Sequence, residues 1–595
     1  MHLKHSEIFQ LRRVQVLKGD PLVRLFFSLL LFGLCGSLTW AQPADDRTKV
    51  ETQPPAERWL AKMSLEQRVG QLLILGFSGQ QLRPSVRKTI DYMHPGSVIL
   101  FKHNVRSLSQ VAELNQKLQS YARKSLDLPL FIMVDQEGGP VARIKTHPPL
   151  PAALAMGNSN DPNLVQDLGR HMGDLLRTLG FNMNLAPVLD IGDPLRKSFI
   201  GNRAFGGDPQ KVSEMALAFS KGLSAASVVP TAKHFPGHGG LSQDSHKKTP
   251  SKLISLEELE ATDLVPFKNY AELKPPTAVM VAHVSYPNID PSGLPAAFSE
   301  TMIREVLRGH LGYKGLVITD DIEMLGADAA GPIEERAIRA VEAGCDMVMV
   351  AWSPRRQLRA FRGLLNAVKS GRISETRLNE SVLRILIAKL QLMPPQADGQ
   401  KEFRKQIKQQ LSALSLVTKQ IAKANFKQGR ATATTKMDRV PANQSLVVFS
   451  SDPAFYSEFL SAKPKNKTKF IRLTPSTLSH VEPYLKAHPS AMAIYFASGS
   501  VTAKNLNGLS REIKQRLMVV NGAYPGAVDS REHFKLVLDL NTPAPESGRW
   551  LAESFLEGTL MPLEDFPADI REPSSKEDAP DDQAARPRRR RTKRL

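Results

Sequence analysis

The chain has 595 residues, of which 42% are hydrophobic, and its 79 Lys and Arg outnumber 59 Asp and Glu to give a net charge of +20. This length exceeds one ordinary core, so we expect two domains with large buried interiors. The two cysteines, Cys35 and Cys345, exclude a disulfide framework and a cysteine-based metal cluster.

The chain begins with a basic segment followed by an uncharged apolar run over residues 25–41. This order is typical of a secretory signal peptide, which we expect at residues 1–41, with an uncleaved membrane anchor as the alternative. Residues 42–55 are polar and are expected to form a linker. The sequence therefore predicts an extracytoplasmic protein, periplasmic or secreted.

From residue 56 to 393, short apolar runs alternate with helical patterns. The expected strands are residues 71–77, 96–101, 129–135, 182–190, 228–234, 278–284, 315–320 and 347–350. The expected helices are residues 108–123, 162–179, 211–225, 255–273, 300–310, 333–343, 355–369 and 375–390. Apolar strands joined by crossover helices indicate a parallel sheet, and eight repeats predict an α/β fold of the (β/α)8, TIM-type barrel class. No glycine-rich phosphate motif follows the first strand, which disfavours a dinucleotide-binding fold.

A smaller C-terminal α/β layered domain is expected at residues 443–565, after a helical connector at residues 394–442. The connector contains a basic amphipathic helix over residues 401–427 and a loose segment over 429–441. Strands of the second domain are expected at residues 446–449, 470–473, 492–496, 517–520 and 536–540.

The last segment, residues 566–595, is expected to be a disordered basic tail. We favour a solvated terminus over a binding arm. As an arm, it would take an anionic envelope polymer or a membrane surface as its partner, and we expect no specific nucleic acid.

Polar residues stand at the carboxyl ends of several expected barrel strands, where barrel enzymes place their chemistry. Burying ionisable groups costs several kcal/mol unless they are paired or used, so a purely structural barrel has no reason to collect them there. These residues are Asp135, Asp190, Lys233, His234, His283 and Asp320.

The loop after the fifth strand carries the strongest signal for catalysis. Its strand ends in Lys233 and His234, a glycine-rich segment follows, and Asp244 precedes His246 by two residues. An Asp beside a His can hold one ring tautomer and raise its basicity, as a proton shuttle requires. Any one of these histidines alone could equally be a satisfied loop side chain, but together they predict a site.

Residues 233–246 resemble the β-N-acetylglucosaminidase (β-N-acetylhexosaminidase) branch of glycoside hydrolase family 3, where Lys-His-Phe-Pro-Gly-His-Gly is followed by Asp-Ser/Thr-His. The resemblance covers residues 60–393. It implies a retaining exo-β-N-acetylglucosaminidase that acts on muropeptide or chitin-type oligosaccharides without a metal or organic cofactor. It also implies that Asp320 is the nucleophile, His246 the acid/base and Asp244 its orienting partner. Because alternate strand residues face opposite ways, Asp321 is expected as a turn residue or helix cap.

The resemblance also implies a set of sugar ligands, with Asp190 and His283 standing behind them. Two positions depart from the family pattern: Pro140 stands where Arg is usual, and Asn202 replaces Asp. The residues expected to bond the sugar are Asp135, Arg143, Arg203, Lys233 and His234.

Other functions remain open from the sequence. A phosphorolytic relative of the same family would use the same residues. A non-catalytic wall-binding protein would use the basic tail, the second domain and the N-terminal anchor. A metal-dependent barrel hydrolase is disfavoured because the first strand has no histidine; its ligands would be His234, His238, His246, His283 and Asp320.

Overall fold

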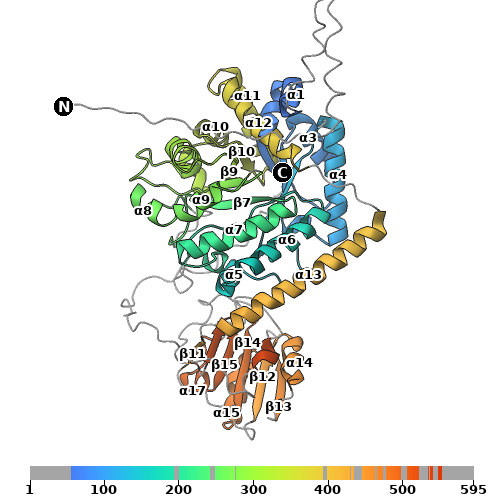
Figure 1. The fold of residues 1–595 in the computed structure, drawn as a ribbon, viewed down its shortest axis with the longest axis vertical. Helices are drawn as coiled ribbons and strands as arrows, with labels where there is room; N and C mark the ends of the chain where they lie inside the picture. The colour runs from blue at the N-terminus through green and yellow to red at the C-terminus, as the bar shows by residue number, and fades with distance from the viewer. Residues whose placement is uncertain are drawn as a thin grey trace, which may run out of the picture. The chain divides into compact units, whose positions relative to one another are not determined.

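The structure, a computed structural model, contains a closed β-barrel ringed by helices and, later in the chain, an open sheet (Figure 1). It describes residues 55–126, 128–192, 200–241, 248–274, 276–392, 399–428, 431–433, 445–462, 464, 467–473, 478–497, 506–521, 534, 536–539 and 547–551. The expected signal peptide, Asp244, His246 and the basic tail lie outside these residues. None of the described helices combines the length and the apolar character needed to cross a bilayer.

The barrel closes in the order β1–β2–β3–β6–β7–β8–β9–β10, and every neighbouring pair is parallel. Its strands are β1 (Leu73–Gly76), β2 (Ser97–Leu100), β3 (Phe131–Val134), β6 (Met183–Asn184), β7 (Val229–Phe235), β8 (Ala278–Val281), β9 (Leu316–Asp321) and β10 (Met347–Val350). The eight-stranded barrel predicted from the apolar runs is therefore confirmed.

Alternate residues of each strand face opposite sides of the barrel wall. Ile74, Ile99 and Met133 belong to the cluster inside the barrel, whereas Leu73 and Val98 pack outward in the larger core under the helices. Both faces are buried, which explains why the strands read as nearly continuous apolar runs.

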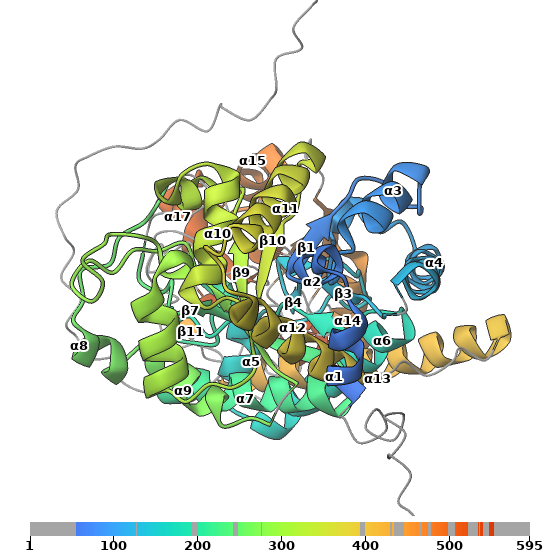
Figure 2. The ribbon, with the colours of Figure 1, turned by 90° about the horizontal axis from the view of Figure 1, so that it is seen from above.

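Helices surround the strands; α7, α9, α10 and α11 lie outside them in Figure 2. The helices from the start of the description through the barrel are α1 (Pro55–Lys62), α2 (Leu65–Gln71), α3 (Pro84–Met93), α4 (Leu108–Leu126), α5 (Ala153–Ser159), α6 (Pro162–Thr178), α7 (Pro209–Ala225), α8 (Leu256–Ala261), α9 (Leu264–Ala271), α10 (Ile333–Ala343), α11 (Pro354–Lys369) and α12 (Glu375–Leu390), with a π-helix at Thr301–His310. Most begin at a Ser or Asp cap, whose side-chain oxygen accepts a free backbone N–H of the first turn, or at an early Pro, which has no N–H to satisfy.

The end of α12 closes the amino-terminal mouth of the barrel. Ile385 of this helix and Leu392 just after it belong to the interior cluster. Lys389 reaches Gln71, just before β1, and lies over the ring of Phe131, the first residue of β3. The opposite, carboxyl-terminal mouth is left for the site.

Two expected elements differ from the structure. The expected strand 182–190 is a strand only at Met183–Asn184, where the Asn184 side chain bonds the backbone of Gln136, and Pro187 further along offers no N–H to a ladder. The expected helix 255–273 is two helices, α8 and α9, because the chain turns at Thr262. The small hairpin β4 (Gln136–Gly138) and β5 (Val141–Ala142), and α1, α2, α3 and α5, were not expected.

After the barrel, α13 (Gly399–Gln428) packs along α5 and α6, with Gln410 donating to Thr178 and Asn425 donating to the Ala155 carbonyl. An open six-stranded sheet follows in the order β11–β16–β15–β14–β12–β13, with β11 antiparallel to its neighbour. Its strands are β11 (Ala431–Ala433), β12 (Leu446–Ser450), β13 (Thr468–Arg472), β14 (Met492–Ala497), β15 (Leu517–Asn521) and β16 (Leu536–Asp539). Its helices are α14 (Pro453–Ser461), α15 (Val481–Ala487) and α17 (Arg511–Lys514). The predicted second α/β layer is confirmed, but the segment expected to be loose contributes β11.

Candidate active site

A cavity of about 720 Å³ opens at the carboxyl ends of the barrel strands. The expected sugar ligands and the expected nucleophile all line it, although they come from strands and loops spread over almost 190 residues of sequence. The structure thus brings together Asp135, Arg143, Arg203, Lys233, His234 and Asp320. Apolar side chains of the barrel interior, Ile99, Met280 and Met349, also line the cavity.

An ion-pair network forms one side of the cavity, and Glu137 on β4 is at its centre. Glu137 accepts two hydrogen bonds from Arg203, at 2.8 and 2.9 Å, and lies 2.6 Å from Lys233 Nζ. Lys233 also donates to Asp135 at 3.0 Å, and Arg143 reaches the other oxygen of Asp135 at 3.3 Å. The network contains three cations and two carboxylates, so it presents both donors and acceptors in fixed positions.

The charged groups at the centre of this network are buried and remain ionised. The side chains of Lys233 and Glu137 are only 3% and 4% exposed. Burial alone would raise the pKa of Glu137, but Arg203 and Lys233 hold it well below its usual range. Burial would likewise lower the pKa of Lys233, and the two carboxylates raise it instead. Both groups therefore stay ionised at neutral pH, and removing either would strand a buried charge.

A second pair orients His234. Its Nδ1 lies 2.6 Å from Asp190 Oδ2, while the backbone N–H groups of His234 and His238 donate to Oδ1 of the same carboxylate. Burial would raise the pKa of Asp190, but the neighbouring His234 and the hydrogen bonds lower it to about 2. Asp190 is fully buried, does not line the cavity and holds His234, which does.

The two adjacent carboxylates at the end of β9 differ in their surroundings. Asp320 is half-buried, and one of its oxygens accepts the N–H of Asp321 at 2.8 Å. Asp321 is buried, and its Oδ1 accepts from the backbone N–H groups of Glu323 and Ala351. Burial raises the pKa of Asp321 to about 7. Both residues line the cavity, so the strand does not turn one fully away, but the turn-residue role expected for Asp321 agrees with these bonds.

His283 supports this strand end from behind. It is fully buried, and its Nε2 lies 3.1 Å from the backbone oxygen of Asp321. Burial lowers the pKa of the His283 imidazole, which keeps it neutral. Within the described ranges, His, Cys, Asp and Glu side chains form no group of three with the geometry of a metal site.

The loop that carries Asp244 and His246 is anchored at both ends, by residues before 242 and after 247. On one side, Lys252 donates to the Gly239 carbonyl at 3.2 Å and pairs with Asp263 at 2.8 Å. Gly237 has a φ of +145°, and a Cβ there would lie 2.4 Å from Asp263 Oδ1, so glycine is required. On the other side, Thr249 donates to the Gly326 carbonyl. Both ends of the loop are thus fixed next to the cavity.

An aromatic stack marks the mouth of the cavity. The rings of Phe101, after β2, and Trp352, after β10, stack with centroids 4.3 Å apart and planes 23° from parallel. Trp352 is 55% exposed, although it is large and apolar. The ring of His103 lies 5.9 Å from Phe101, and all three residues line the cavity.

Two features of the site were missed in the sequence. Glu137 stands two residues after Asp135 in the same motif, so its position was visible, but its contacts to Arg203 and Lys233 join three segments far apart in the sequence. Trp352 stands two residues after the end of the last strand, and a large aromatic residue near a strand end was the available signal.

Comparisons with known proteins agree with this geometry. Residues 64–388 match the family model described as the glycosyl hydrolase family 3 N terminal domain. A β-hexosaminidase of Alkalilimnicola ehrlichii is 40% identical over 289 residues, which cover 47% of this chain and 81% of that protein. One from Pseudomonas aeruginosa is 39% identical over 283 residues, with the same coverage. The solved structure of a glycoside hydrolase family 3 β-N-acetylglucosaminidase from Paenibacillus sp. str. FPU-7 is 29% identical, with a TM-score of 0.71, and the match covers 83% of this chain and 97% of that chain.

Proposed function

The chain belongs to glycoside hydrolase family 3, and on that premise we propose that it is a retaining exo-β-N-acetylglucosaminidase. Its substrates would be peptidoglycan fragments or chitin-type oligosaccharides that end in β-linked N-acetylglucosamine, in an extracytoplasmic compartment. The observation that carries the proposal is the cavity that Asp320 shares with Lys233, Arg143 and His234. The names of the similar β-hexosaminidases and β-N-acetylglucosaminidase support the choice of sugar.

The ion-pair network suits one terminal sugar. Hydroxyl groups both donate and accept hydrogen bonds, and Asp135, Lys233 and Arg143 offer acceptors and donors side by side. A sugar with a hydroxyl missing or inverted would lose one of the hydrogen bonds to these charged groups, which lowers its affinity relative to the correct sugar. Because the network is already assembled by its own ion pairs, little ordering is needed when the sugar binds.

In the first step, an oxygen of Asp320 bonds to the anomeric carbon while the glycosidic C–O bond breaks. The electron pair of that bond stays on the leaving oxygen, which takes a proton from His246. In the second step, His246 takes a proton from water, and the water oxygen bonds to the anomeric carbon as its bond to Asp320 breaks. Asp320 is then a carboxylate again and His246 is protonated, so the cycle is complete.

Asp244 would orient the His246 ring in this scheme, and the anchored ends of their loop support it. Lys252 bonds Gly239 on one side of that loop and Thr249 bonds Gly326 on the other, so both described ends are held in place. Phosphate in place of water in the second step would make the reaction phosphorolytic. Comparing turnover with and without phosphate separates the two reactions.

The proposal is tested with 4-nitrophenyl β-N-acetylglucosaminide and a matched pair of variants. We expect Asp320→Asn to lower kcat at least about a thousandfold, because the nucleophile is lost. We expect Asp321→Asn to retain activity within about tenfold, since an amide oxygen can still accept the two backbone N–H groups. Full activity of Asp320→Asn would refute the assignment, as would a fluorinated aminosugar that labels a different residue.

A further inference from the structure

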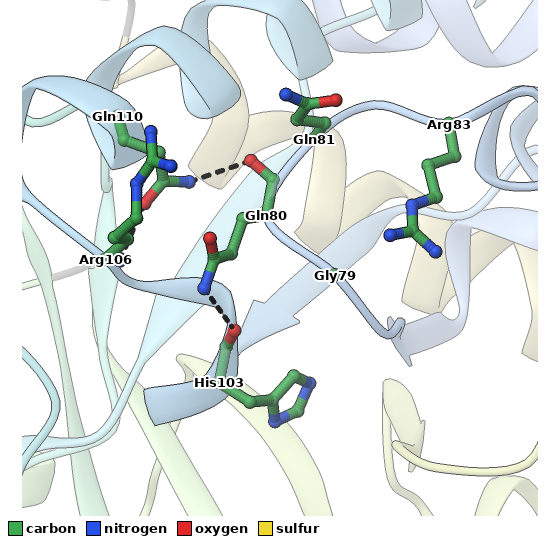
Figure 3. A pocket seen from close by; sticks show the side chains of 7 residues that line it. All are labelled: Gly79, Gln80, Gln81, Arg83, His103, Arg106 and Gln110. Atoms are coloured by element: carbon green, nitrogen blue, oxygen red, sulfur yellow. Dashed lines mark hydrogen bonds between the residues drawn. The ribbon is translucent and has the colours of Figure 1, made fainter.

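A second pocket, of about 390 Å³, lies beside the catalytic cavity in the first two loops at the carboxyl end of the barrel (Figure 3). Arg83 borders one side, and Arg106 with Gln110 borders the other. Gly79 and Gln80 lie between them.

The pocket is held by amide side chains that take up backbone groups. Gln110 donates to the carbonyls of Gln80 and Asn104, at 2.8 and 3.1 Å, and accepts the N–H of Arg106. Asn104 donates to the carbonyls of Phe77 and Gly79, at 2.9 and 2.7 Å. These bonds tie the loop after β1 to the loop after β2, so the pocket has a fixed frame.

The guanidinium groups of Arg83 and Arg106 face this pocket without a carboxylate partner in the described part of the chain. Among the described residues, neither Arg83 nor Arg106 has an ion pair, whereas most other arginines of the barrel do. Arg83 is held over Gly79, where an added Cβ would lie 3.3 Å from its guanidinium carbon. Two cations with no acid between them favour an anion, and a guanidinium fits the two oxygens of a carboxylate.

His103 connects this pocket to the catalytic cavity, because it lines both. Its ring stacks near Phe101, which in turn stacks on Trp352 at the cavity mouth. If the terminal sugar occupies the network of Asp135 and Lys233, the leaving group must pass the mouth. A leaving group that extends along Trp352, Phe101 and His103 reaches the pocket of Arg83 and Arg106.

We propose that this second pocket binds a carboxylate carried by the leaving group of the substrate. The inference rests on the proposed function and deepens it, since it favours acidic, peptidoglycan-type leaving groups over neutral, chitin-type ones. The arginines are exposed, so each contact is worth less than a buried one. Losing both corresponds to about a tenfold change in kcat/KM.

The test compares substrates that differ only in the leaving group. N-acetylglucosamine β-linked to N-acetylmuramic acid carries a carboxylate, its methyl ester removes the charge, and chitobiose lacks the acidic substituent. We expect Arg83→Gln/Arg106→Gln to lower kcat/KM about tenfold on the acidic disaccharide and less than twofold on the other two. Arg87→Gln/Lys88→Gln, which removes two charges from α3 outside the pocket, should change none of them.

Salt and a binding measurement complete the design. The preference of the unchanged protein for acid over ester should shrink when NaCl rises from about 20 to about 500 mM. Calorimetry with Asp320→Asn as the background should give the same tenfold loss in affinity for the acidic disaccharide, without turnover. Equal effects on acid and ester in both measurements would overturn this inference, as would an effect of the control pair equal to that of the arginine pair. If these tests contradict the carboxylate pocket but the protein still cleaves 4-nitrophenyl β-N-acetylglucosaminide, only the pocket is refuted and the proposed function is not.

Discussion

Lys389 in α12 is a buried cation that should weaken the barrel at neutral pH. Its side chain is almost fully buried, and its Nζ has one hydrogen bond, 2.7 Å to Gln71 Oε1, and lies 5.5 Å from the centre of the Phe131 ring. Among the described residues, Lys389 has no ion pair with a carboxylate. Burial lowers the pKa of Lys389 from 10.5 to about 7.

The size of the effect follows from the two pKa values. Between pH 7 and 10.5 the unfolded chain binds a proton that the folded chain increasingly releases, so stability from this group rises with pH. At 1.36 kcal/mol per pKa difference of one, Lys389 costs about 4 kcal/mol at pH 7 and about 2 kcal/mol at pH 9. Below pH 7 the cost levels off near 5 kcal/mol, because Lys389 is protonated in both states.

Lys389→Met keeps the length of the side chain and removes the charge. It also leaves Gln71 Oε1 unpaired, which costs about 1–3 kcal/mol. We therefore expect the variant to be more stable at pH 6, with an advantage that falls by about 2 kcal/mol between pH 7 and 9. Thermal unfolding of the full chain at several pH values measures the difference. The reasoning would be refuted if the difference in stability between Lys389→Met and the unchanged protein did not depend on pH. It would also be refuted if that difference favoured the variant less at pH 6 than at pH 9.

Three further predictions concern the site. Glu137→Gln should lower kcat/KM for 4-nitrophenyl β-N-acetylglucosaminide at least about a hundredfold and destabilise the fold by about 3–5 kcal/mol, because Lys233 and Arg203 lose a buried counter-charge; calorimetry that shows no loss of stability would contradict this. His246→Ala should slow substrates with poor leaving groups most, since they need protonation; equal slowing across leaving groups would exclude the acid role. Trp352→Ala should raise KM for disaccharides about two- to tenfold, with little change for the methyl glycoside, as expected for lost stacking; steady-state kinetics on both substrates decide it.

The barrel could be predicted because its strands are buried on both faces. The runs at residues 72–77 and 347–350 are apolar throughout; the expected strand 71–77 is β1 at Leu73–Gly76, and the expected strand 347–350 is β10 with the same bounds. The expected strand at 182–190 is longer than the observed one because the apolar residues continue after Asn184. Beyond it, Pro187 offers no N–H, and the pairing with β7 is reduced to scattered hydrogen bonds and an isolated bridge from Val188 to Lys233. The length of this strand depends on tertiary contacts, and such contacts leave no periodic pattern of apolar residues in the sequence.

The residues of the site could likewise be predicted only in part. A motif indicates which residues gather at the strand ends, and Asp135, Lys233 and Asp320 do share one cavity. The motif does not indicate which carboxylate the cations hold, so Glu137 was passed over. The pocket of Arg83 and Arg106 could not be predicted either, because it depends on how the loops after the paired strands β1 and β2 fold against each other. The roles of Asp244 and His246 remain predictions.

Glu137, after the third strand of the barrel, connects the loop after the fourth strand with the end of the fifth strand, β7, through Arg203 and Lys233. Substitutions in these three segments should therefore affect one another. A change of sugar preference that altered Arg203 alone would be penalised, whereas the same change with a matching replacement at Glu137 would be tolerated. Libraries that recode these positions together should therefore yield new specificities more often than libraries that vary them singly.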